Sequence, residues 1–287
     1  QNVSGTDPVL LADSKMLAHV PLLLAEEPEV ALTVGYGTGT TSGSMLLHDI
    51  DVHAVEIEEK IIEAAPLFSE VNYASYADPD LDIVLDDARN YIATTNEEFS
   101  VIVTDVTNLK YKRNPYLYTR EYFEIMQEAL SADGVAAAWL PVGGLSFNDL
   151  RTLIATFDSV FPHTTAWYFT QFPTHFIILV GTPGPTRVNL AELKDKVVDV
   201  ERDLESLYED ESYRMMIADD GSALLFHRCA EESPGEEWGS LQLEQVRFAE
   251  EHPLGSSGDP AWIDGVAAMT AAARRYPVSA VYLDAIH

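Results

Sequence analysis

The segment "LTVGYGTGTTSG", residues 32–43, places three glycines at alternate positions directly after an apolar, strand-forming run. Glycine at the junction of a strand and a helix lets the backbone adopt positive φ and approach a ligand closely. The dinucleotide-binding pattern G-x-G-x-x-G needs its third glycine where this chain has Thr40. The spacing of Gly35, Gly37 and Gly39 therefore favours a nucleoside ligand without a pyrophosphate, and a turn that needs glycine only for packing is the alternative.

Short apolar runs alternate with helical patterns between residues 29 and 182, which predicts βαβ units and a mostly parallel sheet. The expected strands are residues 29–35, 51–57, 81–86, 99–105, 134–140, 164–170 and 175–181, and the expected helices include 58–69, 119–130 and 147–161. Only "QFPT" separates the last two strands, which is too short for a parallel crossover, so we expect an antiparallel hairpin there. This α/β pattern resembles the seven-stranded, Rossmann-like sheet of the S-adenosylmethionine (SAM) transferase fold.

A boundary is expected at "GTPGPT", residues 181–186. Beyond it, apolar residues recur at spacings of three and four: Leu190, Leu193, Val197, Val200, Leu204 and Leu207. Such a short stripe is more typical of a helix packed on its own domain than of a dimer seam. The sequence thus predicts a lead-in segment and helix (1–28), a nucleoside-binding domain (29–185) and an acidic helical C-terminal extension (186–287), with further helices at 241–252 and 262–276.

The composition excludes several classes of function. Asp and Glu number 47 against 17 Lys and Arg, so the formal net charge of −30 repels nucleic acid and anionic membranes. This acidity is typical of a halophilic surface, and a field that gathers cationic substrates is the alternative. The one cysteine, Cys229, excludes an internal disulfide framework, and the eight histidines show no metal-ligand spacing, so we expect no metal.

Acidic residues end three of the expected strands. Glu56 can accept hydrogen bonds from two ribose hydroxyls, and Ile57 beside it belongs to the same expected nucleoside site. Asp87 can accept from an exocyclic adenine amine, while the amide of Ala88 can donate to the ring. Asp105 ends the fourth strand. Because the carboxyl ends of parallel strands meet at one edge, we expect these acids to line a ligand site, although solvated acids at strand ends are the alternative.

Several segments resemble, in order, those of spermidine synthases, the polyamine aminopropyltransferases. They are "MLAHVPLLL" (16–24), "GYGTGTTSG" (35–43), "VEIEEKIIEAA" (55–65), "VLDDARNYI" (84–92), "VTDVTN" (103–108) and "LYTREYFEIMQEALSADGV" (117–135). The resemblance covers about residues 13–182 and is closest to the branch fused behind membrane segments in bacteria and archaea. It implies a cytoplasmic enzyme or cytoplasmic domain, and a membrane segment upstream of Gln1 fits that branch.

The resemblance also implies roles for single residues. The glycine loop wraps the methionine part of SAM or decarboxylated SAM, Glu56 holds the ribose, and Asp105 takes the proton from the attacking amine. The implied nucleoside-binding residues are Gly35, Gly37, Thr38, Gly39, Glu56, Ile57, Asp87 and Ala88, and Thr107 and Asn108 are expected to bind substrate. Residues 114–118 are expected to form a lid segment between strand and helix, with Tyr118 packing over the substrate. A small-molecule amine is the implied acceptor, and the oligomeric state, including a homodimer, stays open.

Three departures from the family's pattern leave the reaction open. Thr38 and Asn108 stand where the family has aspartates for the aminopropyl ammonium and the acceptor amine, and Asp13 with Ser14 replaces a tyrosine and a histidine. The candidates are aminopropyl transfer from decarboxylated SAM, a methyltransferase or lyase that uses intact SAM, and a non-catalytic nucleoside-binding module of a membrane-fused protein. The basic cluster Lys110, Lys112 and Arg113 favours a zwitterionic or anionic acceptor if it is more than a solvated loop.

Overall fold

A computed structural model describes residues 8–106, 114–141, 145–167, 176–186, 190–205, 215–217, 224–226 and 282–284. Several expectations fall on other residues and lie outside this description. They are the substrate-binding roles of Thr107 and Asn108, the basic cluster at residues 110–113, and the helices at 241–252 and 262–276.

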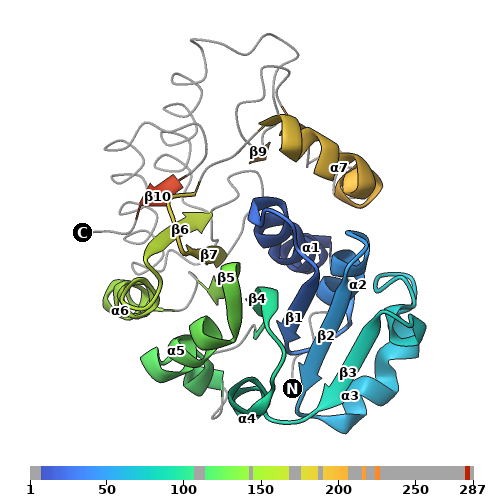
Figure 1. The fold of residues 1–287 in the computed structure, drawn as a ribbon. Helices are drawn as coiled ribbons and strands as arrows, with labels where there is room; N and C mark the ends of the chain where they lie inside the picture. Colours follow the sequence, from blue (N-terminus) through green and yellow to red (C-terminus); the bar gives the residue numbers. More distant parts are fainter. Residues whose placement is uncertain are drawn as a thin grey trace.

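In the described part of the chain, one eight-stranded sheet has the order β10-β6-β7-β5-β4-β1-β2-β3 (Figure 1). Its strands are β1 (Val30–Val34), β2 (Asp51–Glu56), β3 (Leu81–Leu85), β4 (Phe99–Thr104), β5 (Leu130–Pro141), β6 (His163–Trp167), β7 (Phe176–Thr182) and β10 (Tyr282–Asp284). Strands β5, β4, β1, β2 and β3 are parallel, while β7 pairs antiparallel with both β5 and β6. All seven expected strands and the hairpin are confirmed.

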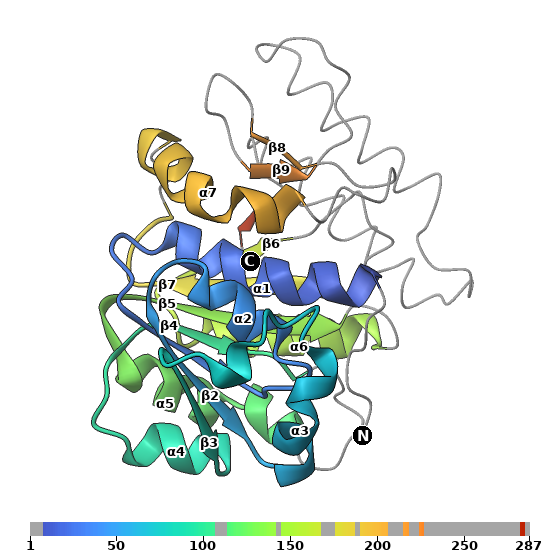
Figure 2. The same ribbon diagram turned by 90° about the vertical axis from the view of Figure 1, so that its right-hand side faces the viewer.

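Helices cover both faces of the sheet, which explains why β1 and β4 are apolar along almost their whole length (Figure 2). One face carries α1 (Pro8–Leu24), α2 (Thr40–Leu46), α3 (Glu59–Ala64) and α7 (Leu190–Glu205), and the other carries α4 (Ala88–Thr94), α5 (Arg120–Ala129) and α6 (Phe147–Asp158). The parallel strands therefore end at one edge, where the β1–α2, β2–α3 and β3–α4 connections and the segment after β4 lie together.

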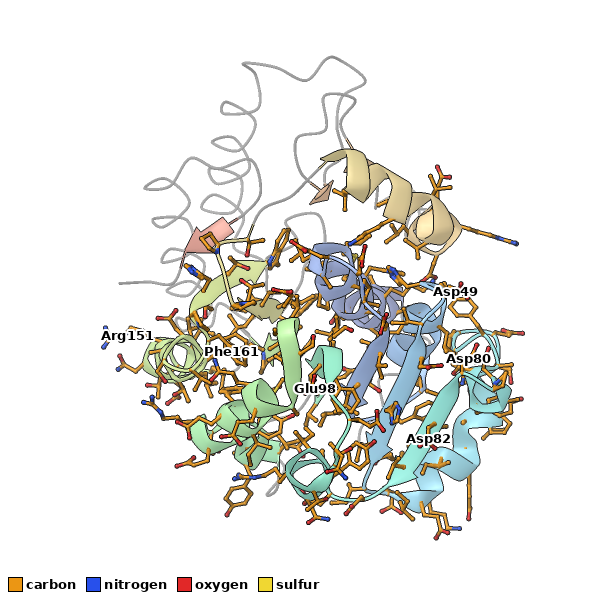
Figure 3. The ribbon with its side chains drawn as sticks, viewed as in Figure 1. Asp49, Asp80, Asp82, Glu98, Arg151 and Phe161 are labelled. Atoms are coloured by element: carbon orange, nitrogen blue, oxygen red, sulfur yellow. The ribbon has the colours of Figure 1, made fainter. Side chains whose placement is uncertain are left out.

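The face under α5 and α6 is packed with aromatic rings. Phe123 of α5 meets Phe157 of α6 edge-on, with 4.9 Å between ring centroids. Phe161, labelled in Figure 3, packs on Gly181 of β7, where a Cβ atom would collide with its ring. Figure 3 also labels the exposed acids Asp49, Asp80 and Asp82 on the β2–β3 side of the sheet.

Within its described residues, the expected C-terminal extension contains the helix α7 and three short strands. β10 pairs antiparallel with β6, so that it extends the expected seven-stranded sheet by one strand, and β8 (Met215–Ile217) pairs with β9 (Leu224–Phe226). Three-residue strands are too short to show a period of two in the sequence. The edge of β6 offers backbone hydrogen-bonding groups that β10 satisfies.

Helix α7 packs on its own domain, as its apolar stripe predicts. Leu193, Val197, Val200 and Leu204 are buried in the same apolar cluster as α1. Within the described residues, none of the helices combines the length and the apolar character needed to cross a bilayer.

Candidate functional site

The loop between β1 and α2 adopts the conformation that its glycines predict. Gly35, Gly37 and Gly39 have φ angles of 92°, 57° and 85°. A Cβ atom on Gly35 would lie 3.0 Å from the carbonyl oxygen of Asp105, and one on Gly39 would collide with the hydroxyl of Tyr36. Glycine is therefore needed twice, once for the close approach of the β1 and β4 ends and once for the buried ring of Tyr36.

Glu56, at the end of β2, anchors this loop. Its Oε2 accepts hydrogen bonds from the backbone N–H of Tyr36 at 3.1 Å and of Gly37 at 3.4 Å, and its Oε1 accepts from the N–H of Glu58 at 2.9 Å. The side chain is largely covered, since Glu56 is 5% exposed. Because a carboxylate has about four acceptor positions, about one stays open for a ribose hydroxyl.

Asp105 follows β4 and lies near enough to Glu56 to feel its charge. Its backbone N–H donates to the carbonyl oxygen of Val34 at 2.9 Å, which holds it beside the start of the glycine loop. Its Oδ2 accepts a hydrogen bond from Thr41 Oγ1 at 2.6 Å. Burial raises the pKa of Asp105 to about 6; the negative charge of Glu56 adds to this rise, and the bond from Thr41 opposes it. The structure thus brings together two of the three predicted acids.

The third predicted acid, Asp87, stands at the same edge of the sheet but is exposed and caps α4. Its carboxylate accepts a hydrogen bond from the N–H of Arg89 at 3.0 Å. Ala88, the first residue of that helix, is buried, whereas Ile57 is 49% exposed just after β2. An exposed isoleucine beside Glu56 offers an apolar surface at the edge of the sheet where the sequence predicts a nucleoside.

Tyr118, for which substrate binding is predicted, lies in the interior of the fold. It is 4% exposed, and its hydroxyl lies within hydrogen-bonding distance of the carbonyl oxygens of Val106 and Trp139. Burial raises the pKa of Tyr118 well above its ordinary value, and the neighbouring Tyr122 and Asp105 add to the rise. The side chain therefore supports the segment after Asp105 through Val106, and its substrate-binding role stays a prediction.

Asn72 was missed by the sequence analysis, yet it fixes the glycine loop at Thr38. Its Nδ2 donates to the carbonyl oxygens of Thr38 at 2.9 Å and of Ala65 at 3.0 Å. Thr38 itself is buried, and its hydroxyl lies 3.0 Å from that of Thr40. An asparagine in a loop carries no spacing signal that connects it to a distant glycine turn, so only the fold reveals this role.

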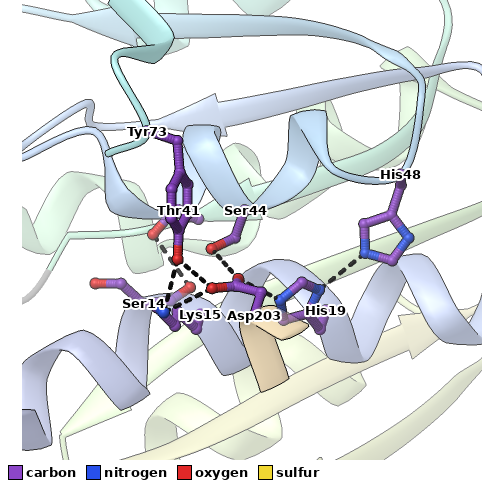
Figure 4. A network of polar contacts seen from close by, with 8 residues as sticks. All are labelled: Ser14, Lys15, His19, Thr41, Ser44, His48, Tyr73 and Asp203. Carbon is purple, nitrogen blue, oxygen red and sulfur yellow. Dashed lines mark hydrogen bonds and ion pairs between the residues drawn. The ribbon is translucent and has the colours of Figure 1, made fainter. Parts of the chain in front are cut away.

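A second missed feature is the polar cluster of Lys15, His19, Ser44, Tyr73 and Asp203, whose members are buried except for Tyr73, which is 42% exposed (Figure 4). The Asp203 carboxylate on α7 accepts hydrogen bonds from Ser44 Oγ at 2.8 Å and from the hydroxyl of Tyr73. It also forms an ion pair with Lys15 at 2.6 Å and lies within hydrogen-bonding distance of His19 Nε2, at 2.8 Å. Figure 4 shows the Thr41 and Ser14 contact next to this cluster.

Among the described residues, no group of three or more His, Cys, Asp or Glu side chains is arranged to hold a metal ion.

The strand order, the glycine loop and the acids at the strand ends define a SAM-methyltransferase-like domain. The family model of the spermine/spermidine synthase domain matches residues 10–182, and the chain belongs to this family. A polyamine aminopropyltransferase of Thermotoga petrophila is 30% identical over 164 residues, which cover 56% of this chain and 55% of that protein. One of Saccharolobus solfataricus is 29% identical over 191 residues, 64% of this chain and 63% of that protein.

Solved structures agree with this assignment. A spermidine synthase in complex with the transition-state analogue AdoDATO has a TM-score of 0.56 at 27% identity, covering 64% of this chain and 63% of that one. The spermidine synthase of Thermotoga maritima has a TM-score of 0.54 at 27% identity, covering 64% and 62%. The chain spans about half the length of the first curated relatives, for example 55% of the Thermotoga petrophila protein.

Proposed function

We propose that this domain transfers an aminopropyl group from decarboxylated SAM to a small amine and releases methylthioadenosine. The observation that carries the proposal is the meeting of Glu56 and Asp105 at the glycine loop. Glu56 accepts hydrogen bonds from the loop amides, and the backbone of Asp105 touches the loop at Gly35. Relatives named polyamine aminopropyltransferases, and spermidine synthases with the same fold, support the choice of reaction.

The chemistry needs one base and little else. The amine nitrogen attacks the carbon next to the sulfonium, a C–N bond forms, and the C–S electron pair returns to sulfur, which leaves as a neutral thioether. A protonated amine has no lone pair, so a carboxylate must take its proton. Asp105 suits this role because burial brings its pKa to about 6, closer to neutral working conditions than that of an ordinary aspartate.

The charge of the site supports a cationic donor. Glu56, Asp105 and Asp87 at this edge are all acidic. Decarboxylated SAM carries a sulfonium and an ammonium, and both positive charges are complementary to such an edge.

Intact SAM is the second candidate donor, and Thr38 is the observation that favours it. Thr38 is uncharged and its hydroxyl is directed to Thr40, so the loop places no carboxylate there to repel the carboxylate of intact SAM. A methyltransferase or lyase would follow from this choice of donor.

Mass spectrometry of the nucleoside product distinguishes these reactions. Incubation with either donor and a panel of amines and amino acids should yield methylthioadenosine from decarboxylated SAM, whereas methyl transfer from intact SAM would yield S-adenosylhomocysteine. Nucleoside binding in calorimetry without product from any acceptor would contradict both reactions and support a non-catalytic module.

Asp105→Asn tests the base. We expect turnover to fall at least about 100-fold, the lower range for general-base catalysis, with unchanged affinity for methylthioadenosine. Asp80→Asn is the matched control, because it removes one exposed negative charge just before the amino end of β3, away from the site. Equal rates in wild type and Asp105→Asn would remove Asp105 as the base.

A further inference from the structure

The hydroxyl of Thr41 lies between two acceptors. Thr41 belongs to α2 and is 1% exposed. Its Oγ1 is 2.6 Å from Asp105 Oδ2 and 3.3 Å from the backbone carbonyl oxygen of Ser14 on α1. A threonine hydroxyl has a single proton to donate and two lone pairs with which to accept. Thr41 can therefore donate to only one of these neighbours at a time.

We propose that Thr41 is a positioning residue for Asp105, whose hydroxyl serves both protonation states of that carboxyl. The inference rests on the proposed function, in which Asp105 receives the amine proton. While Asp105 is ionised, Thr41 donates its proton to Oδ2. Once Asp105 carries the proton, its carboxyl donates to Thr41 Oγ1, and the Thr41 proton turns to the carbonyl oxygen of Ser14. The transferred proton stays on Asp105, and no buried donor loses its partner.

Two features keep the Thr41 hydroxyl in this place. Lys15 follows Ser14 on α1, and Ser44 lies one helical turn after Thr41 on α2. Both side chains contact the carboxylate of Asp203, so the polar cluster ties α1 to α2 next to the contact between Thr41 and Ser14 (Figure 4). Thr41 and Ser14 are themselves buried, so the protein covers the hydroxyl and the carbonyl oxygen that it can reach.

The groups around Asp105 act on its titration in opposite directions. The bond from Thr41 favours the ionised carboxylate, whereas burial and the charge of Glu56 on β2 favour the protonated form. The charge of Asp105 in turn helps to raise the pKa of Tyr118, which belongs to the 3-10 helix Asn114–Tyr118, so that Tyr118 stays uncharged beside Asp105. Of these influences, only burial and the charge of Glu56 remain once the Thr41 hydroxyl is removed, and both favour the protonated form of Asp105.

Thr41→Val tests this inference because valine keeps the shape of threonine without its hydroxyl. The titration of Asp105 can be followed by infrared spectroscopy as the protonated-carboxyl band that Asp105→Asn lacks. We expect Thr41→Val to raise the midpoint by about one pH unit, and Thr41→Ser to return most of that shift. Ser42→Ala is the matched control, because it also removes a buried hydroxyl from α2. The Ser42 hydroxyl lies 2.9 Å from that of Thr33 and does not contact Asp105.

Turnover supplies the second readout. The acidic limb of the rate profile should move with the midpoint, so that Thr41→Val loses about tenfold at low pH and approaches the wild-type rate at high pH. Affinity for methylthioadenosine should stay unchanged. An unshifted midpoint in Thr41→Val overturns the inference, as does a shifted midpoint that the rate does not follow. Absence of turnover in the wild type would contradict the proposed function and not the role of Thr41. In that case the infrared midpoints of Thr41→Val and Thr41→Ser alone test whether Thr41 sets the titration of Asp105.

Discussion

The carboxylate of Asp203 meets the Nζ of Lys15 at 2.6 Å, so a buried ion pair joins the C-terminal helix α7 to the first helix α1. Both side chains are almost fully covered by protein. His19, 184 residues before Asp203, approaches the same carboxylate from the next turn of α1. The carboxylate therefore receives donors from two turns of one helix while it stays out of contact with water.

Asp203→Asn should destabilise the fold by about 3 kcal/mol, because Lys15 would keep its charge in a buried site and lose its carboxylate partner. The measurement is the free energy of unfolding in urea. Glu201→Gln is the control, since it removes an exposed acid from the same helix and should change the value by less than about 0.5 kcal/mol. Equal losses in both variants would show that the ion pair contributes nothing specific.

The free energy of unfolding should decrease as the pH is lowered, and His48 should account for part of this decrease. Burial lowers the pKa of His48 to about 3, and the charges of His19 and Lys196 add to this shift. As pH falls below about 6.5, the unfolded chain binds a proton at this histidine while the folded chain does not, so folding loses up to about 1.4 kcal/mol per pH unit. The stability associated with the neutral, buried His48 is therefore fully present above pH about 6.5 and is lost progressively as the pH falls toward about 3.

A comparison of variants isolates that contribution. His48→Gln should lose less stability than the wild type when urea unfolding is compared at pH about 7 and about 5. His163→Gln replaces an exposed histidine on β6 and should follow the wild type. Parallel curves for wild type and His48→Gln would contradict a lowered pKa at His48.

Gly39→Ala should distort the glycine loop and abolish nucleoside binding. The left-handed backbone, with φ of 85°, costs an alanine about 1–2 kcal/mol, and its Cβ would also displace the buried Tyr36. Calorimetry with methylthioadenosine measures the binding. Gly184→Ala is the control, because a Cβ there would meet no atom within 4 Å. Wild-type affinity in Gly39→Ala would show that the loop does not contact the nucleoside.

Glu56→Gln should weaken methylthioadenosine binding at least about tenfold, because hydrogen bonds to a charged carboxylate contribute about 1.5–3 kcal/mol. The same change should lower the midpoint of Asp105, since the negative charge of Glu56 helps to raise its pKa. This shift is opposite in sign to that expected for Thr41→Val. Glu70→Gln, at an exposed site, should change neither the affinity nor the midpoint. An unchanged midpoint in Glu56→Gln would show that the charge of Glu56 does not influence the pKa of Asp105.

Local patterns predict the sheet well because its central strands β1 and β4 are buried almost throughout and helical segments separate the parallel strands along the chain. The positive φ angles of the glycine loop are likewise local, since no other residue tolerates them at low cost. The roles of Glu56 and Asp105 follow from strand ends meeting at one edge. Asp87 also stands there, but the sequence does not show that its carboxylate caps a helix.

Contacts between distant segments leave no such pattern. Thr40 and Thr41 are adjacent and chemically identical, yet only the direction of each side chain around α2 sends one hydroxyl to Thr38 and the other to Asp105. In the sequence, Asp203 is one of several acids on a charged helix. Its ion pair with Lys15 becomes evident only when α7 packs against α1. Tyr118 reads as a loop aromatic, and only its depth in the fold shows that its hydroxyl is engaged by backbone carbonyls.

The insertion of Asp203 between α1 and α2 also governs how the protein can be shortened. Truncation near residue 185 would preserve every strand of the parallel sheet but delete the acid that neutralises Lys15. An ammonium, an imidazole and two hydroxyls would then converge on a gap beside the candidate catalytic centre. A recombinant fragment meant to retain the native arrangement of that centre should therefore extend at least through Glu205.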